Sequence, residues 1–175
     1  MSKGEFTFPI SVGLANAIRR TIITDIESWA ADSVTFKKNS SCQTDEYIAH
    51  RIGLIPFVKI GNGDTMELNV NGRTACASDM KGSNFRVVKD TEIIEMIENQ
   101  EIIATIFFKK KKGSVHARYK MCSGVGLQML QNDMYKLVFE PLNEEDPNDV
   151  LVNAISCLNE KIDRALEDVG KMTVS

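Results

Sequence analysis

Two clusters of polar residues interrupt helical patterns that are otherwise apolar, and their residue types suit the binding of another protein. The first cluster holds Asn16, Arg19 and Arg20, and the second holds Glu46, His50 and Arg51. A guanidinium can donate two parallel hydrogen bonds to a carboxylate, or donate to backbone carbonyls, so these arginines could clamp a partner. The alternative is a solvated helix face, where a charged pair contributes only a few tenths of a kcal/mol.

The cysteines and histidines show none of the spacings that hold a metal ion or build a catalytic pair. More than thirty residues separate each cysteine from the next, and His50 and His116 belong to no HxxxH or CxxC pattern. We therefore predict no metal, no cofactor and no catalytic residue, and we expect free thiols in a reducing compartment. An enzymatic function lacks a nucleophile paired with a base.

A run of lysines, Lys109–Lys112 followed by Gly113, has two interpretations. It lies between predicted strands at residues 101–109 and 114–121, so the simpler interpretation is a solvated hairpin tip. The other is a patch that contacts phosphates, which would make the chain a free-standing homodimeric protein that binds RNA or DNA. Such binding should depend steeply on salt and should be lost when the lysines are replaced.

Both polar clusters fall on predicted helices. The helix within TDEYIAHRIGLIP, residues 44–56, has Thr44 as its N-cap and ends at Pro56. Its buried stripe consists of Ile48, Ile52 and Ile55. The other helix follows Ser11, and its apolar face is predicted to run through Leu14, Ile18, Ile22, Ile26 and Trp29. These stripes orient the polar clusters away from the core.

Strand patterns account for most of the remaining chain. Residues 5–10 and 31–38 are rich in β-branched and aromatic types, and residues 134–141 alternate like a strand with one buried face. Short apolar pieces separated by glycines predict a β-rich lobe of hairpins after residue 56. The glycine-rich segment 123–127 is predicted to be a connection.

The last predicted helix begins near Pro147 and carries a long, narrow apolar stripe. Its residues recur at steps of four and three: Leu151, Ile155, Leu158, Ile162, Ala165 and Val169. Such spacing matches another helix better than a flat sheet, so we predict a dimerisation helix. The helix could also lie on its own sheet, and both arrangements can hold because Val152 and Leu166 widen the stripe.

Composition sets the broad class. The 175 residues, 43% of them hydrophobic, suffice for one core or for one domain with a smaller inserted lobe. The formal net charge of -3, with acids and bases interspersed, argues against a basic protein that wraps DNA. The N-terminus lacks the apolar run of a signal peptide, and no segment approaches the roughly 20 apolar residues of a membrane span. We expect an intracellular protein with no membrane partner.

The order of these motifs resembles the alpha-like subunit of cellular RNA polymerases. The resemblance is carried by ISVGLANAIRR, NSS before the second helix, DEYIAHRIGLIP, and YKLVFEP with the helix at 148–170. By motif the chain is most similar to the third-largest subunit of eukaryotic RNA polymerase II and to its archaeal counterpart. It is more distantly similar to the N-terminal domain of bacterial alpha.

The resemblance implies an α+β fold, with helices packed on an antiparallel sheet. Residues 1–56 and 125–175 would form a discontinuous dimerisation domain, interrupted by a β-rich insert at residues 57–124. It also implies a non-catalytic assembly platform that pairs with a smaller homologous subunit and docks the two large catalytic subunits. The motifs that contain the two polar clusters face a large subunit in the family, so both clusters would serve one docking surface.

Departures from the family pattern limit what carries over. Some relatives hold zinc or an iron-sulfur cluster in the insert, whereas this insert has only Cys76 and Cys122, so no metal is expected. The sequence ends at Ser175, where bacterial alpha continues into a DNA-binding domain, so we expect no direct sequence-specific DNA contact. The short insert fits the polymerase of a large DNA virus. The expected location is the nucleus, or a cytoplasmic viral factory or virion if the polymerase is viral.

Overall fold

The computed structural model describes residues 3–172 and divides the chain into two compact units. Unit 1 takes in the chain up to Glu27, then Lys112–Val115, and then the chain from Lys120 onward. Unit 2 consists of Ser28–Lys111 and His116–Tyr119. Each unit has its own hydrophobic core.

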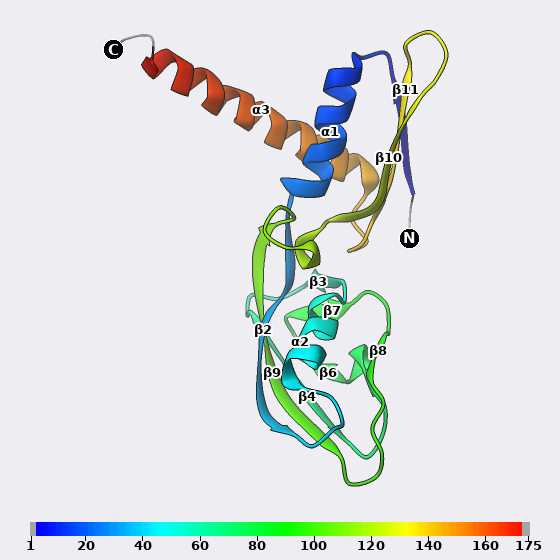
Figure 1. Cartoon of the computed structure of the whole chain (residues 1–175), viewed down its shortest axis with the longest axis vertical. Helices are drawn as coiled ribbons and strands as arrows, with labels where there is room; N and C mark the ends of the chain where they lie inside the picture. Colours follow the sequence, from blue (N-terminus) through cyan, green and yellow to red (C-terminus); the bar gives the residue numbers. More distant parts are fainter. Residues whose placement is uncertain (1–2, 173–175) are drawn as a thin grey trace. The chain divides into compact units, whose positions relative to one another are not determined.

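Unit 1 is an antiparallel sheet covered by two helices (Figure 1). Its strands are β1 (Gly4–Phe8), β10 (Cys122–Met129) and β11 (Tyr135–Pro141), in the order β1-β11-β10. Its helices are α1 (Val12–Thr24) and α3 (Pro147–Met172). Residues 123–127, predicted to be a connection, belong to β10 because they pair with β11 around a bulge at which Gly124 has a φ of +59°.

One face of the unit 1 sheet is apolar and packs against both helices. Phe6, Leu137 and Phe139 lie on this face, and Phe6 stacks on Phe139 with ring centroids 5.7 Å apart. From α1 come Ile18 and Ile22, both buried. The opposite face carries an ion-paired trio of Lys3, Glu5 and Lys136. The alternation predicted for residues 134–141 is therefore confirmed.

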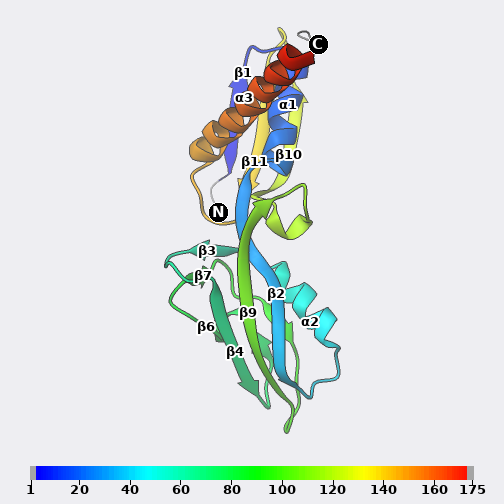
Figure 2. The ribbon, with the colours of Figure 1, turned by 90° about the vertical axis from the view of Figure 1, so that its left-hand side faces the viewer.

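Unit 2 is built on a twisted four-stranded sheet in the order β2-β9-β4-β6, which Figure 2 shows with its long strands side by side. These strands are β2 (Glu27–Asn39), β9 (Glu101–Lys112), β4 (Thr65–Asn71) and β6 (Met80–Lys81). Two small sheets pair β3 (Phe57–Lys59) with β7 (Phe85–Val87), and β5 (Ala75–Cys76) with β8 (Glu92–Ile94). The helix α2 (Asp45–Gly53) and short 3-10 turns at Ala77–Asp79 and Ala117–Tyr119 complete the unit.

The core of unit 2 joins α2 to the sheets. Ile48, Ile52 and Ile55 are buried in it, as their spacing predicted. Phe85 and Phe108 stack beside them with centroids 3.9 Å apart. Because α2 contributes its whole apolar stripe to this core, it belongs to unit 2 rather than to the unit that contains α1.

The structure confirms the predicted α+β class, and it corrects several local predictions. The apolar stripe of the first helix stops short, because α1 ends at Thr24 and Trp29 lies in β2 against the core of unit 2. Leu14 is exposed, and Ala15 takes the buried position instead. The strand predicted at 114–121 is absent, because residues 117–119 form a 3-10 turn that ends at Tyr119 and directly follows His116.

The boundaries predicted at residues 56 and 124 differ from those of the compact units. Strand β2 pairs with β9, so the chain enters unit 2 at Ser28, well before Pro56. The division into a dimerisation domain and an insert at 57–124 stays a prediction about the family. Across residues 3–172, no helix has both the length and the apolarity that crossing a membrane requires.

Candidate functional site

The first polar cluster lies on α1 in unit 1. Ser11 caps this helix, its hydroxyl accepting from the amide of Leu14 at 3.3 Å, as predicted. The Asn16 side-chain oxygen accepts two hydrogen bonds from Arg19, from Nε at 3.1 Å and from Nη2 at 2.9 Å. This contact holds the Arg19 guanidinium against the helix surface, where it is half-buried.

A groove that a partner segment could enter lies beside this cluster. It has a volume of about 540 Å³ and is lined by residues of α1 and β10: Val12, Gly13, Asn16, Arg19, Val125 and Leu127. Val125 and Leu127 line it from β10, and Val12 lines it from α1 together with the Asn16-Arg19 pair. A partner segment with an apolar side chain next to an acceptor group would fit this lining.

Arg20 faces a second groove, between α1 and α3. The groove measures about 220 Å³, and its lining includes Arg20, Thr24, Asp25, Leu158 and Lys161. Lys161 is bound there, with its Nζ 2.7 Å from Asp25 Oδ2. The Arg20 side chain is exposed and has no hydrogen-bond or ion-pair partner among residues 3–172. Its charge is therefore available to a partner.

The second polar cluster lies on α2 in unit 2, and its helix forms as the sequence predicts. The Thr44 hydroxyl accepts from the amide of Tyr47 at 3.4 Å, and the acidic Asp45 and Glu46 occupy the first turn, where the helix dipole favours them. Glu46 and His50 are exposed and have no side-chain partner within the described chain.

Arg51 differs from its two neighbours because the fold uses it internally. Its Nη2 donates to the backbone carbonyl of Glu92 at 2.8 Å, and its Nη1 donates to the Tyr47 hydroxyl at 3.3 Å. The bond to Glu92 ties α2 to β8, and the bond to Tyr47 lies within α2. Arg51 is thus a structural tie first, whereas Glu46 and His50 remain open to a partner.

Two cavities flank the contact between Tyr47, Arg51 and Glu92. One measures about 430 Å³ and extends toward Cys42 and Ile97; the other measures about 400 Å³ and extends toward His50 and Leu54. Their walls carry large exposed apolar side chains: Tyr47 at 45%, Leu54 at 51% and Ile97 at 71% exposure. Sequence reasoning missed these residues, although Tyr47 and Leu54 stand seven apart on the helix face that carries His50 and Arg51.

The sequence-predicted docking residues thus divide between the units. Asn16, Arg19 and Arg20 lie on unit 1, while Glu46, His50 and Arg51 lie on unit 2. That both clusters serve a single surface stays a prediction.

The helix α3, predicted from the sequence to be a dimerisation helix, has two apolar faces. One face packs on the core of its own unit, unit 1, where Val150 and Ala154 are fully buried. Leu151 and Leu158 pack against the same core. The other face carries a line of side chains that we name the exposed seam: Val152, Ile155, Asn159, Ile162, Leu166 and Val169. Its apolar members are between 41% and 65% exposed.

The predicted stripe therefore mixes the two faces. Leu151 and Leu158 serve the core of unit 1, whereas Ile155, Ile162 and Val169 lie on the exposed seam and Ala165 is exposed beyond the packed part of the helix. Whether any of them contacts a second chain stays a prediction. The signal that separates the faces is the pair Val150 and Ala154, whose small volumes allow close packing against α1 and the sheet.

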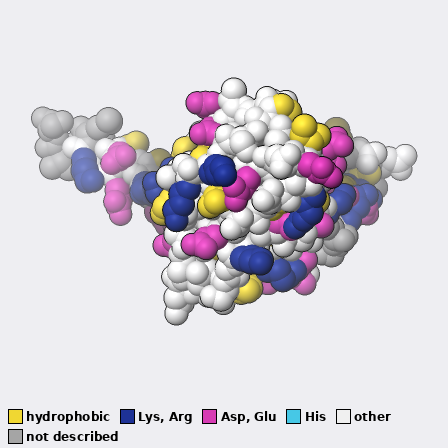
Figure 3. All heavy atoms as spheres, turned by 90° about the horizontal axis from the view of Figure 1, so that it is seen from below, with side chains coloured by type: hydrophobic (Ala, Val, Ile, Leu, Met, Phe, Trp, Pro, Cys, Tyr) yellow, Lys and Arg dark blue, Asp and Glu magenta, His cyan; other side chains and the backbone are white. Residues whose placement is uncertain are grey.

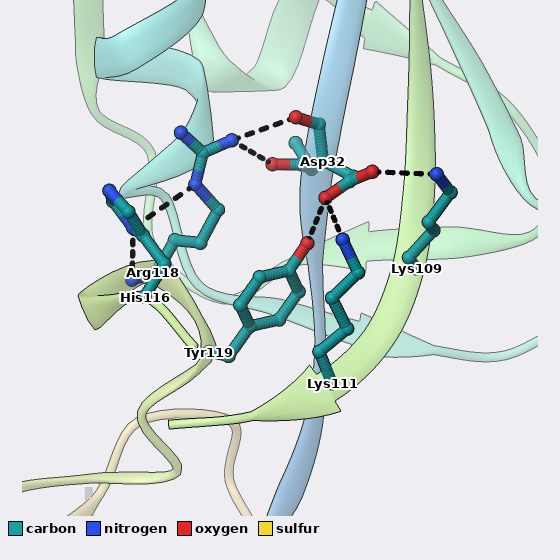
Figure 4. A network of polar contacts seen from close by, with 7 residues as sticks. Asp32, Lys109, Lys111, His116, Arg118 and Tyr119 are labelled. Atoms are coloured by element: carbon teal, nitrogen blue, oxygen red, sulfur yellow. Dashed lines mark hydrogen bonds and ion pairs between the residues drawn. The ribbon is translucent and has the colours of Figure 1, made fainter. Parts of the chain in front are cut away.

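A network around Asp32 in unit 2 was not predicted from the sequence. Figure 4 shows the Asp32 carboxylate accepting from Lys111 Nζ at 2.8 Å, from Lys109 Nζ at 2.9 Å and from the Tyr119 hydroxyl. Arg118 Nη1 donates to the carbonyls of Ala31 and Asp32 at 3.0 and 2.9 Å. The network fastens the end of β9 and the turn at 117–119 to β2.

Electrostatics follow from these contacts. Hydrogen bonds from Lys111, Tyr119 and Lys109 hold the pKa of the Asp32 carboxyl well below its usual range. Burial, together with the bond to Asp32, raises the pKa of the Tyr119 phenol well above its usual range. The Asp32 carboxyl therefore stays ionised, and the Tyr119 phenol stays protonated, across all ordinary pH values.

The lysine run is therefore no hairpin tip. Lys109–Lys112 form the end of β9, and two of the four ammonium groups bind Asp32. On the face that Figure 3 shows, lysine and arginine side chains are interspersed with aspartate and glutamate. Mixed charge of this kind lacks the single-sign field that draws a protein to nucleic acid.

Cysteine chemistry gives no further site. Burial raises the pKa of the Cys122 thiol to about 12, which keeps it protonated and unreactive. Within residues 3–172, no three of the His, Cys, Asp and Glu side chains are grouped so that they could hold a metal ion.

Comparisons with known proteins give relatives of one kind. The chain is 29% identical to DNA-directed RNA polymerase subunit Rpo3 of Methanocaldococcus jannaschii, over 94% of this chain and 90% of that protein. It is 31% identical to the Rpo3 subunit of Halobacterium salinarum, over 70% of this chain and 53% of that protein. It is 28% identical to DNA-directed RNA polymerase II subunit rpb3 of Dictyostelium discoideum, over 62% and 47%. The chain thus spans about half of the last two relatives, and no family model matches it.

The order of the sequence motifs, the α+β fold and these relatives agree. They confirm the resemblance drawn from the motifs: this chain is a homologue of the alpha-like subunits of multisubunit DNA-directed RNA polymerases.

Proposed function

We propose that this protein is a non-catalytic assembly platform within a multisubunit DNA-directed RNA polymerase. It pairs through α3 with a smaller homologous subunit, and it docks the two large catalytic subunits through the polar clusters on α1 and α2. An intracellular location follows from this role.

The observation that carries the proposal is the exposed seam of α3. Five large apolar side chains lie exposed along several turns of one helix, so they form a patch and are not scattered surface residues. Exposed patches of this kind mark protein contacts. Their period fits a second helix. The similarity to Rpo3 and rpb3 subunits supplies the polymerase context.

Docking of the large subunits rests on the unpaired polar groups. Arg20, Glu46 and His50 are exposed and have no partner within the described chain, and each lies beside a groove or an exposed apolar side chain. Interfaces commonly combine apolar area with charged groups that fix the register. Arg19 and Arg51 are already held by Asn16 and by Glu92, so they would meet the partner in a preset position.

Co-expression tests the proposal. The tagged chain is produced together with the smaller alpha-like subunit and the two large subunits of the polymerase from the same source, and native mass spectrometry gives the composition of the purified complex. We expect one copy of the chain per complex and a stable heterodimer when the large subunits are omitted. A chain that purifies as a monomer, indifferent to all three, would overturn the proposal.

A further inference from the structure

The exposed seam of α3 contains one polar residue among its apolar ones. Its members follow one another at steps of three, four, three, four and three: Val152, Ile155, Asn159, Ile162, Leu166 and Val169. The mean step of about 3.5 residues is the period at which two helices keep a continuous contact. Asn159 stands in the middle of this line, where a partner helix would pass directly over it.

The Asn159 side chain is not used in any contact that the structure describes for residues 3–172. It is exposed, and it makes no hydrogen bond to any residue among those that the structure describes. If an apolar helix covered the seam, the amide would lose water and gain nothing, which is unfavourable for a group with two donors and an acceptor. A partner that fits must therefore present a hydrogen-bonding side chain at this position.

The two edges of the seam differ in charge. On the inner edge, which faces the rest of unit 1, Leu158 is half-buried and Lys161 is held by Asp25. That edge is therefore already in contact with unit 1 itself. The outer edge carries Glu160, Asp163 and Glu167, and the carboxylates of Asp163 and Glu167 have no cationic partner within the described chain. A partner helix must pass this acidic edge, so basic residues on its flank are favoured.

We propose that Asn159 is a register and selectivity residue of the α3 interface. The occupant of the seam is then a helix from another polypeptide, with an apolar stripe, one side chain that pairs with the Asn159 amide, and a basic flank. A single buried asparagine is known to fix register in paired helices while lowering affinity. This inference rests on the proposed pairing through α3.

A second copy of the chain fits less well than such a partner. Two copies could pair Asn159 with Asn159, but in an antiparallel arrangement their acidic edges would face each other and repel. Self-association is therefore an outcome of the test rather than the occupant that we infer.

Synthetic helical peptides test the inference on the full chain. All carry the same apolar stripe and lysines on one flank. The first has asparagine at a central stripe position, the second has isoleucine there, and the third has the asparagine moved by seven residues. Affinities for the wild-type chain and for Asn159→Ile are measured by fluorescence anisotropy. Asn153→Ile is the matched control, because Asn153 is an exposed asparagine of the same helix outside the seam.

The wild type should prefer the centred asparagine to isoleucine by about tenfold or more, which is the cost expected for an unpaired buried amide. The shifted asparagine should bind less well than the centred one, because it forces a register with fewer apolar contacts. Asn159→Ile should reverse the first preference, and Asn153→Ile should leave it unchanged. Sedimentation of each variant alone reports self-association.

The outcomes separate the inference from the proposed function. If all peptides bind the wild type equally, α3 takes a helix but Asn159 does not select it, and the inference fails alone. If no peptide binds, or if Leu166→Asp leaves binding unchanged, the seam does not accept a helix and pairing through α3 fails as well. If the wild type self-associates more tightly than it binds any peptide, a second copy is the occupant and the inference is overturned.

Discussion

The two units differ in how far their conspicuous side chains find partners within the fold. In unit 2, the charged groups that stand out in the sequence are largely satisfied internally: Lys109 and Lys111 bind Asp32, and Arg51 binds the carbonyl of Glu92. In unit 1, α3 leaves a row of large apolar side chains uncovered. These charges of unit 2 are therefore used within its own fold, whereas unit 1 has a continuous row of apolar side chains whose burial would be favourable. This contrast is the reason that we propose α3 as the main protein-contact surface.

The largest expected effect comes from a charge placed on the seam. Leu166→Asp should weaken pairing with the smaller subunit by about 100-fold or more, because it puts an unpaired carboxylate into an apolar contact. Titration calorimetry with the purified smaller subunit measures the loss. Asn153→Asp is the matched control, with the same new charge on the same helix but off the seam. Equal affinities for the two variants would show that the seam is not the contact.

Asp32→Asn should have the next largest effect, and it should act on stability rather than on binding. Removing the charge leaves Lys109 and Lys111 without their anion, at a cost of about 2 kcal/mol in the free energy of unfolding of unit 2. Urea unfolding followed by Trp29 fluorescence measures the loss, because Trp29 packs in the unit 2 core.

The same variant has a defined pH dependence. The folded-state pKa of Asp32 lies below its ordinary value of 3.8, so its stabilising contribution is fully present above pH 3.8 and is lost as the pH falls below it. The stability difference between wild type and Asp32→Asn should be constant near neutral pH and should shrink in strong acid. A difference that grew on acidification would mean that the network does not stabilise the carboxylate.

Single changes in the polar clusters should have intermediate effects on assembly. Arg20→Ala and Glu46→Ala should each weaken capture of the large subunits by about 1 to 3 kcal/mol, with no loss of folded stability, because neither side chain has a partner within the described chain. Quantitative pull-down with thermal unfolding of each variant checks both points. Lys37→Ala, another exposed charge, is the control.

Arg51→Ala sharpens the distinction between docking and folding. It should lower the melting temperature as well as weaken assembly, because it frees α2 from the Glu92 carbonyl. If Glu46→Ala lowered the melting temperature as much as Arg51→Ala, the second cluster would be a structural tie and not a docking site.

The smallest effect concerns nucleic acid. Replacing Lys109 and Lys111 by alanine should leave the affinity for RNA and DNA unchanged, because these groups already bind Asp32. Filter binding at several salt concentrations measures it. A steep salt dependence in the wild type, lost in the double variant, would favour the homodimeric nucleic-acid-binding alternative.

Local patterns predicted the elements that carry the polar clusters. Ser11 and Thr44 cap their helices as expected, and Ile48, Ile52 and Ile55 are buried, because caps and helical spacing are short-range properties. The role of the lysine run was mispredicted because its partner, Asp32, lies far away in sequence. Only the pairing of β2 with β9 brings them together, and no local pattern encodes that contact.

The candidate site was predicted in part. Asn16, Arg20, Glu46 and His50 were predicted on exposed helix faces and are exposed, while their docking role stays a prediction. The exposed apolar Tyr47 and Leu54, beside the second cluster, were missed. On α3, spacing alone could not assign residues to the inner or the outer face, because apolar residues surround much of the helix. Packing against α1 and the sheet decides that Val150 and Ala154 are inside and that Asn159 is outside.

The most direct test of pairing through α3 is a photo-crosslinking residue in place of Ile162, within the polymerase purified from its own source. Ile162 is exposed in this chain and lies on the seam next to Asn159. We expect mass spectrometry to find the crosslink on a helix of a smaller alpha-like subunit. An assembled, active polymerase in which position 162 reacts only with solvent would contradict pairing through this helix.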